Sequence, residues 1–106
     1  MSENAVNGVA NDVANDPGVS KVVKITNRRG LHARASAKFV TMASGLAADV
    51  SVAKDGGPAV VGTSIMGLMM LGAAMGDSIR ISASGDDAEM ALEMLATLVE
   101  EKFGED

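Results

Sequence analysis

The chain has 106 residues, enough for one domain with a single compact core, and its formal net charge of −5 argues against broad affinity for nucleic acid. It contains no cysteine and one histidine, which excludes disulfides, thiolate zinc sites, a cysteine nucleophile and most multi-histidine metal sites. Two phenylalanines, without Trp or Tyr, leave no aromatic surface on which bases could stack.

Residues 1–19 contain no Lys or Arg and no long apolar run, which excludes a signal peptide, a transit peptide and a membrane span there. Repeated Asn, Asp and Gly indicate a flexible tail, and Pro17 with Gly18 marks a turn before the folded part. We therefore predict a tail over residues 1–19 and one domain over residues 20–106.

The first predicted strand covers residues 21–26, with Val23 and Ile25 on one face. Residues 27–30 follow as a loop, in which Gly30 is free to adopt a positive φ. The local charge is high, because residues 21–38 hold six of the nine Lys and Arg residues and no acid. The sequence therefore predicts an anion-attracting region on an otherwise acidic body.

Apolar residues at i, i+4, i+7 and i+8 predict a helix over residues 33–44, which ends before Gly45. Its inward positions are Ala35, Phe39, Met42 and Ala43. Alternation then predicts a strand over residues 48–53, and Asp55-Gly56 supplies a hairpin turn.

The hairpin returns as a short third strand over residues 57–61, and a short helix follows over residues 64–72. A fourth strand is predicted over residues 77–82, with Ile79 and Ile81 inward.

The last predicted helix covers residues 87–102 and carries acidic residues on its outer face. Its inward positions are Ala88, Ala91, Leu92, Leu95, Leu98 and Val99. The element order is βαββαβα, and each strand has one apolar face. This pattern predicts an α+β fold, an open-faced sandwich whose sheet is covered by helices on one side, rather than a doubly wound α/β fold.

The first stretch that carries chemistry is GLHARAS, residues 30–36. His32 falls where the second element begins, and the first backbone N–H groups of a helix have no internal partners. Those donors and the positive end of the helix dipole form an anion site, which Arg34 can reach with a planar guanidinium. A neutral imidazole in this place is a competent nucleophile, and the site can hold a phosphoryl group attached to it.

A histidine near a helix start is more often a plain surface or capping residue. Gly30, Arg34 and the basic stretch around His32 favour chemistry over that interpretation. The segment holds no second histidine, paired carboxylate or Walker-type loop, so it is poorly equipped for hydrolysis or metal chemistry. It is well equipped to carry a group that another protein transfers.

The second stretch covers residues 62–71 and is rich in methionine. Leu68, Leu71 and Gly72 are expected to face the core, whereas the other apolar side chains either fill the core or form a docking patch. Ser64 fits the N-cap position of this helix. A phosphate on Ser64 would place two negative charges beside the patch.

Together the two stretches resemble the HPr family, the histidine-containing phosphocarriers of bacterial phosphoenolpyruvate-dependent phosphotransferase systems. The resemblance covers residues 21–102 and is carried by GLHAR around His32 and by SIMGL at residues 64–68. It implies a four-stranded antiparallel sheet with three helices on one face, and a carrier rather than an enzyme. His32 matches the histidine that is phosphorylated on Nδ1, Arg34 the active-site arginine, and Ser64 the serine that an HPr serine kinase modifies in many members.

The resemblance also implies a mechanism. An Enzyme I-type protein, charged from phosphoenolpyruvate, docks on the methionine-rich patch and the basic rim, and neutral His32 attacks its phosphohistidine. Phospho-His32 then donates to a histidine of a IIA-type acceptor through the same surface. The expected phosphate-binding residues are Ala33, Arg34 and Ala35, and the expected docking residues are Ile65, Met66 and Met69. We expect a cytoplasmic monomer with no metal, no cofactor and no nucleic-acid or membrane partner.

One residue departs from the family pattern, because Ala35 stands where the family usually has proline. Proline suits the first helical turn since it lacks an N–H that is unpaired there. Ala35 restores that donor, so phosphate binding should survive. With Arg28, Arg29, Gly30 and the methionine-rich helix, the substitution is similar to the nitrogen-related branch, which we favour over sugar uptake.

Two rival hypotheses belong to other classes. A nucleic-acid-binding α+β module has a related element order, but the chain lacks aromatic residues to stack on bases. A regulatory interaction module would use the same surfaces without phosphorylation of His32, and it predicts that His32→Ala leaves partner regulation intact.

Overall fold

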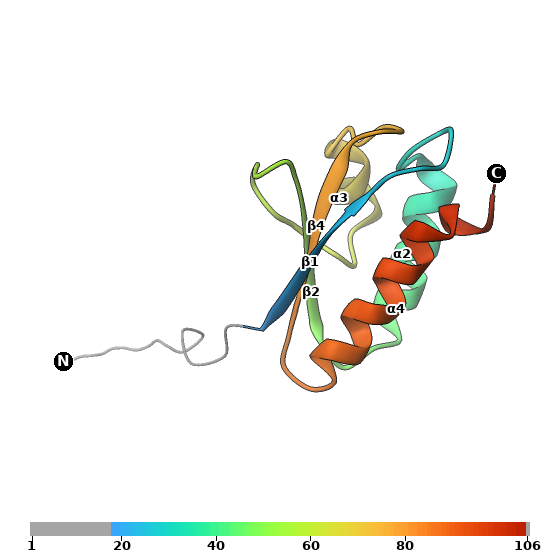
Figure 1. Cartoon of the computed structure of the whole chain (residues 1–106). Helices are drawn as coiled ribbons and strands as arrows, with labels where there is room; N and C mark the ends of the chain where they lie inside the picture. Colours follow the sequence, from blue (N-terminus) through green and yellow to red (C-terminus); the bar gives the residue numbers. More distant parts are fainter. Residues whose placement is uncertain (1–17, 106) are drawn as a thin grey trace.

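The computed structural model describes residues 18–105 (Figure 1). Its elements are β1 (Val19–Lys24), α2 (Ala33–Ser44), β2 (Asp49–Lys54), β3 (Val60–Val61), α3 (Ile65–Met70), β4 (Ser78–Ser84), α4 (Ala88–Glu100) and the short 3-10 segment η1 (Lys102–Gly104). The predicted βαββαβα order is confirmed. Most of the predicted tail, residues 1–17, lies outside the described residues, and Val19 already belongs to β1.

The four strands form one sheet in the order β1-β4-β2-β3, and every neighbouring pair is antiparallel. The helices cover one face of this sheet, and the strands present their apolar side chains to that face (Figure 1). Helices α2 and α4 run in opposite directions, so the end of α4 lies beside the beginning of α2 (Figure 1). This arrangement brings the C-terminal part of the described chain to the helix start that holds His32.

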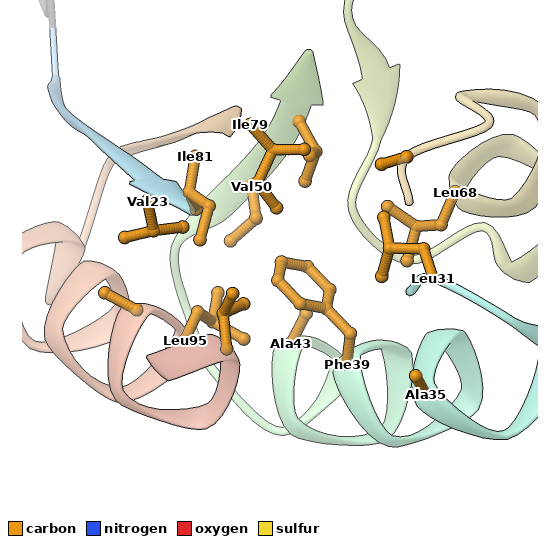
Figure 2. Packing of buried hydrophobic residues seen from close by; sticks show 14 of the residues in the cluster. Val23, Leu31, Ala35, Phe39, Ala43, Val50, Leu68, Ile79, Ile81 and Leu95 are labelled. Atoms are coloured by element: carbon orange, nitrogen blue, oxygen red, sulfur yellow. The ribbon is translucent and has the colours of Figure 1, made fainter. Parts of the chain in front are cut away.

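Buried apolar residues fill the space between the sheet and the helices (Figure 2). Phe39 of α2 points towards Ile79 and Val50 of the sheet and is fully buried. Of the predicted inward positions on α2, Ala35, Phe39 and Ala43 are buried, whereas Met42 is half-buried.

The Asp55-Gly56 turn is confirmed as a hairpin turn with left-handed backbone at both positions, φ 47° and φ 79°. The predicted third strand over residues 57–61 was too long, because only Val60–Val61 pairs with β2. Pro58 has no N–H to give to a ladder.

Most other predicted bounds differ from the structure by one or two residues, as for the strands predicted over residues 48–53 and 77–82 and the helix predicted over residues 64–72. Two of the differences have a clear physical reason. The first strand begins two residues before the predicted residues 21–26, because β4 continues to Ser84 and offers partners to Val19 and Ser20. The last helix stops at Glu100 instead of running over residues 87–102. Lys102 has a φ of 61°, which turns the backbone out of the helix.

Ion pairs connect some of these segments. Asp77 accepts a hydrogen bond from the Ala74 N–H at 2.9 Å and lies 3.3 Å from the Lys54 ammonium. These two contacts, the first being the stronger, hold the pKa of Asp77 below its ordinary value of 3.8.

Within residues 18–105, no helix has the length and apolar character needed to cross a membrane.

Candidate functional site

The start of α2 is positioned by a tight loop against the turn that follows α3. The Gly30 N–H donates to the Asn27 carbonyl at 3.2 Å, and the Leu31 N–H donates to the Ala73 carbonyl at 3.0 Å. Gly30 has a φ of +65°, and a Cβ there would lie 2.5 Å from the Ala73 oxygen. Only glycine satisfies both conditions, so the predicted role of Gly30 is confirmed and His32 is held at a defined place.

His32 occupies the N-cap position of α2, and its side chain makes no capping hydrogen bond. The first helical bond runs from the Ser36 N–H to the His32 carbonyl at 2.9 Å. Within residues 18–105, the N–H groups of Ala33, Arg34 and Ala35 have no backbone acceptor. Ala33 and Arg34 are exposed whereas Ala35 is fully buried, so the N–H groups of the first two, at the positive end of the helix dipole, make the anion-binding surface.

Only one of the two nitrogens of the His32 ring has a hydrogen-bond partner among the described residues. Its Nε2 lies 2.8 Å from Oε2 of Glu105, and the two side chains are 14% and 21% exposed. Nδ1 has no hydrogen-bond partner among the described residues. Since Oδ1 of Asn27 is the one buried side-chain N or O atom without a partner in that part of the chain, Nδ1 must keep some contact with solvent.

Glu105 is held by two donors, because Asn27 Nδ2 binds its Oε1 at 3.1 Å while His32 binds its Oε2. Asn27 Nδ2 also donates to the Gly30 carbonyl at 2.8 Å, which ties the carboxylate to the loop before α2. The hydrogen bond from Asn27, then that from His32, lowers the pKa of Glu105 below its ordinary value of 4.5, and the charge of Arg29 adds to the effect. The carboxylate is therefore ionised and acts as an acceptor near neutral pH.

Three arginines surround the outer side of this carboxylate. Arg28, Arg29 and Arg34 line a hollow of about 290 Å³ together with Glu105. Arg34 is exposed and makes no hydrogen bond or ion pair to another described residue, so its guanidinium is available to an incoming anion.

The basic stretch is not one continuous surface. Lys21 lies 3.7 Å from Glu100, and Lys38 donates to the Phe103 carbonyl at 2.7 Å. The arginines, rather than these two lysines, supply the positive charge at the site.

The second stretch has its own geometry. Ser64 is the N-cap of α3, as predicted, and its Oγ accepts a hydrogen bond from the Gly67 N–H at 2.9 Å. Leu68 is buried as predicted, but Leu71 is half-buried and Gly72 is exposed. Gly72 was expected in the core and leaves it because α3 ends at Met70 and its own φ is +65°.

The remaining apolar side chains of α3 are exposed, between 40% for Ile65 and 80% for Met70. The members of this α3 patch are Ile65, Met66, Met69 and Met70. Helix α3 packs beside α2, and the turn after it contacts the residue next to His32 through the bond between Leu31 and Ala73. The sequence left Met70 undecided between core and patch, and its exposure assigns it to the patch.

Two residues of the site were missed by sequence reasoning. Glu105 lies 73 positions from His32 along the chain, and no local pattern indicates that they meet. Asn27 directly precedes the arginine pair, and its place in a turn before a helix was the only signal. Both aromatic residues, Phe39 and Phe103, are buried, so neither offers a base-stacking surface.

Comparison with known proteins adds an independent line. The family model described as "PTS HPr component phosphorylation site" matches residues 19–101. The phosphocarrier protein HPr of Neisseria meningitidis is 46% identical over 83 residues, covering 78% of this chain and 92% of the relative. The phosphocarrier protein NPr of Shewanella violacea is 37% identical over 87 residues, covering 82% of this chain and 94% of the relative. The relatives therefore include proteins named HPr and proteins named NPr.

Solved structures agree with the sequence relatives. The crystal structure of HPr from Thermoanaerobacter tengcongensis superposes with a TM-score of 0.78 at 43% identity, covering 83% of this chain and 98% of that one. The HPr of Bacillus anthracis gives a TM-score of 0.72 at 44% identity, with 76% and 95% covered. Neither comparison supports a nucleic-acid-binding module or a purely regulatory module.

Proposed function

The chain belongs to the HPr family and is a phosphocarrier of the phosphotransferase system rather than an enzyme, and from that premise we propose that His32 carries the phosphoryl group on Nδ1. The observation that carries this proposal is the state of the ring. Nε2 is bound to Glu105, whereas Nδ1 is unpartnered and belongs to a residue at the open end of α2.

The transfer conserves protons on the carrier. The Nδ1 lone pair of His32 attacks the phosphorus of a phosphohistidine on an Enzyme I-type donor. The new N–P bond forms as the donor's N–P bond breaks, and its electron pair returns to the donor's ring nitrogen. The proton on Nε2 stays in place, and the reverse set of bond changes passes the phosphoryl group to a IIA-type acceptor. The phosphoramidate is already activated, so no nucleotide is required.

Charge at the end of α2 stabilises the phosphorylated form. The exposed N–H groups of Ala33 and Arg34 donate to phosphoryl oxygens, and the Arg34 guanidinium adds charge from the adjacent hollow. Ala35, the third expected phosphate-binding residue, has an N–H that the proline usual in this family lacks, but the residue is fully buried.

Both partners dock on the α3 patch and the arginines of the hollow. The exposed apolar side chains supply contact area, and methionine adapts to differently shaped partners. A small interface suits a carrier that must leave each partner quickly. We propose that the carrier acts as a monomer; HPr of T. tengcongensis has been crystallised as a dimer. We assign the relay to the cytoplasm, where phosphoenolpyruvate is available.

The test is to incubate the full chain with phosphoenolpyruvate and an Enzyme I-type protein. We expect a mass gain of one phosphoryl group that is lost in acid and that NMR places on Nδ1 of His32. A phosphoryl group on any other residue, or on Nε2, would overturn the proposal, as would a protein that gains none while a known HPr is phosphorylated in the same mixture.

Ser64 gives this surface a regulatory position. We expect Ser64→Asp to slow phosphoryl transfer to His32 by about tenfold, because a negative charge next to the α3 patch must be desolvated when the donor docks. Transfer rates at limiting donor would measure the effect. Aspartate is itself a good N-cap, so α3 should remain folded.

Two further variants separate charge from structure. Ser64→Ala removes the cap without adding charge and should leave the transfer rate near that of the unmodified protein. Ser44→Asp adds the same charge at the exposed end of α2 and should also leave the rate unchanged. Equal rates for Ser64→Asp and Ser44→Asp would remove Ser64 from the docking surface. Whether an HPr serine kinase modifies Ser64 is then tested by mass spectrometry of the protein isolated from cells.

A further inference from the structure

The Glu105 carboxylate contacts His32 at the ring nitrogen other than the one proposed to carry the phosphoryl group. Glu105 binds Nε2 of His32, the ring nitrogen that the transfer does not use, at 2.8 Å, and both side chains are half-buried. We propose that Glu105 is a positioning residue, which fixes the tautomer and the orientation of His32 and stabilises its ring while it carries the phosphoryl group. This proposal rests on the proposed function of His32 as the phosphoryl acceptor.

The tautomer follows from the chemistry of the two partners. A neutral imidazole has one N–H donor and one acceptor nitrogen, and an ionised carboxylate only accepts. The short contact to Glu105 therefore requires the proton to be on Nε2. Nδ1 is then the nitrogen with the free lone pair, and it is the one without a partner among the described residues.

The folded chain holds the carboxylate firmly in place. Three consecutive residues with left-handed backbone, at φ 61°, 55° and 76°, reverse the chain after α4. These residues are Lys102, Phe103 and Gly104. Phe103 inserts into the core at 1% exposure, and Lys38 of α2 holds its carbonyl at 2.7 Å. Asn27 then binds the second oxygen of the carboxylate, so neither side of it is left to rotate.

Two features of the segments that hold Glu105 are energetically unfavourable. Asn27 is fully buried with Oδ1 unpartnered among residues 18–105, while its Nδ2 serves both the loop and Glu105. Non-glycine residues with left-handed backbone are also unfavourable. Both features lie in the segments that bring Glu105 and His32 together.

Glu105 keeps its role after transfer. When Nδ1 forms the bond to phosphorus, the ring still bears the Nε2 proton and becomes formally cationic. The carboxylate at 2.8 Å then faces a positive ring, and this attraction is stronger in the phosphorylated state and in the transition state than before the transfer. Removing the carboxylate should therefore slow phosphoryl acceptance.

The first test reads the tautomer directly and needs no phosphoryl donor. His32 is the one histidine of the chain, so two-bond ¹H–¹⁵N NMR of the full protein reports its ring without overlap. With the ring neutral, we expect the wild type to show a protonated Nε2. In Glu105→Ala the ratio of Nε2–H to Nδ1–H tautomers should fall by about tenfold, since a charge-assisted hydrogen bond is lost. Glu101→Ala removes an exposed carboxylate nearby and should leave the ratio unchanged.

The second test measures phosphoryl acceptance for the same variants. Glu105→Ala should be about tenfold slower than Glu101→Ala. Glu105→Gln keeps the shape and one accepting oxygen without the charge, so its rate should lie between those of the wild type and Glu105→Ala. A fold check by NMR accompanies each variant, and the glutamine variant decides the matter if the alanine variant is unfolded.

The outcomes separate this inference from the proposed function. An unchanged tautomer ratio in Glu105→Ala, or a transfer rate equal to or above that of Glu101→Ala, would overturn the role of Glu105 while leaving His32 as the carrier. If the wild type gains no phosphoryl group on His32, the proposed function fails, and the tautomer ratio still decides whether Glu105 orients the ring.

Discussion

His32→Ala should reduce phosphoryl acceptance from an Enzyme I-type donor by roughly 10³-fold or more, to the background of the assay, because the variant has lost its only imidazole. The chain has no cysteine, so no other side chain of comparable nucleophilicity can take over. The fold should survive, since the His32 side chain makes no capping bond and its backbone keeps the first helical bond of α2. Quantitative mass spectrometry of the intact protein under non-acidic conditions measures the loss.

A matched control variant shows whether a loss of phosphoryl acceptance is specific to His32. Thr41→Ala changes an exposed residue of the same helix and should accept phosphate at the wild-type rate. An acid-labile phosphoryl group that persists on His32→Ala would move the carrier residue elsewhere. The rival hypothesis of a regulatory module predicts that partners are regulated normally by His32→Ala, whereas the carrier hypothesis predicts that every effect requiring phosphoryl transfer disappears.

The second large effect concerns stability. Phe39→Ala should lower the free energy of unfolding by about 3–5 kcal/mol, the range measured when a buried aromatic is truncated. The side chain is fully buried and points from α2 towards Val50 and Ile79 of the sheet, near Leu95 of α4 (Figure 2). Its removal leaves a cavity between layers that cannot collapse without moving a helix. The total free energy of unfolding of a small domain is about 5–15 kcal/mol. Urea denaturation should therefore show a large decrease in the urea concentration at the unfolding midpoint.

Two comparisons calibrate that measurement. Phe39→Leu retains much of the volume and should cost about 1–2 kcal/mol. Met66→Ala changes a side chain that is 71% exposed and should stay within about 0.5 kcal/mol of the wild type. A loss below about 1 kcal/mol for Phe39→Ala would mean that the layers repack around the gap, and the expected cavity would not form.

Some elements could be predicted because their signals are local. The apolar spacing of α2 and the glycine that follows it define Ala33–Ser44 without help from the rest of the chain. Gly30, the Asp55-Gly56 turn and the Ser64 cap were predicted for the same reason, since each depends on the conformational or hydrogen-bonding preference of one or two residues. The GLHARAS segment likewise places a histidine at an open helix start by its own order of residues.

The residue at which a strand ends depends on the neighbouring strands with which it pairs. The predicted bounds that were wrong are mostly of this kind. Val19 joins β1 because Ala83 lies opposite it, and β3 is short because Pro58 cannot pair with β2. Local alternation carries no information on how far a neighbouring strand extends. Met70 is another example, since a helix that is apolar on several sides is divided into core and surface only by what packs against it.

The amino-acid sequence by itself determined the layered α+β fold and the place of His32 at a helix start, because these follow from patterns within a few residues. Only the tertiary structure decided that Glu105 binds Nε2 of His32, that Asn27 holds Glu105, and that Lys21 and Lys38 are used elsewhere. The physical reason is distance along the chain. Hydrogen bonds of about 3 Å between residues more than 60 positions apart depend on how α4 runs back along α2, and no local preference encodes that path.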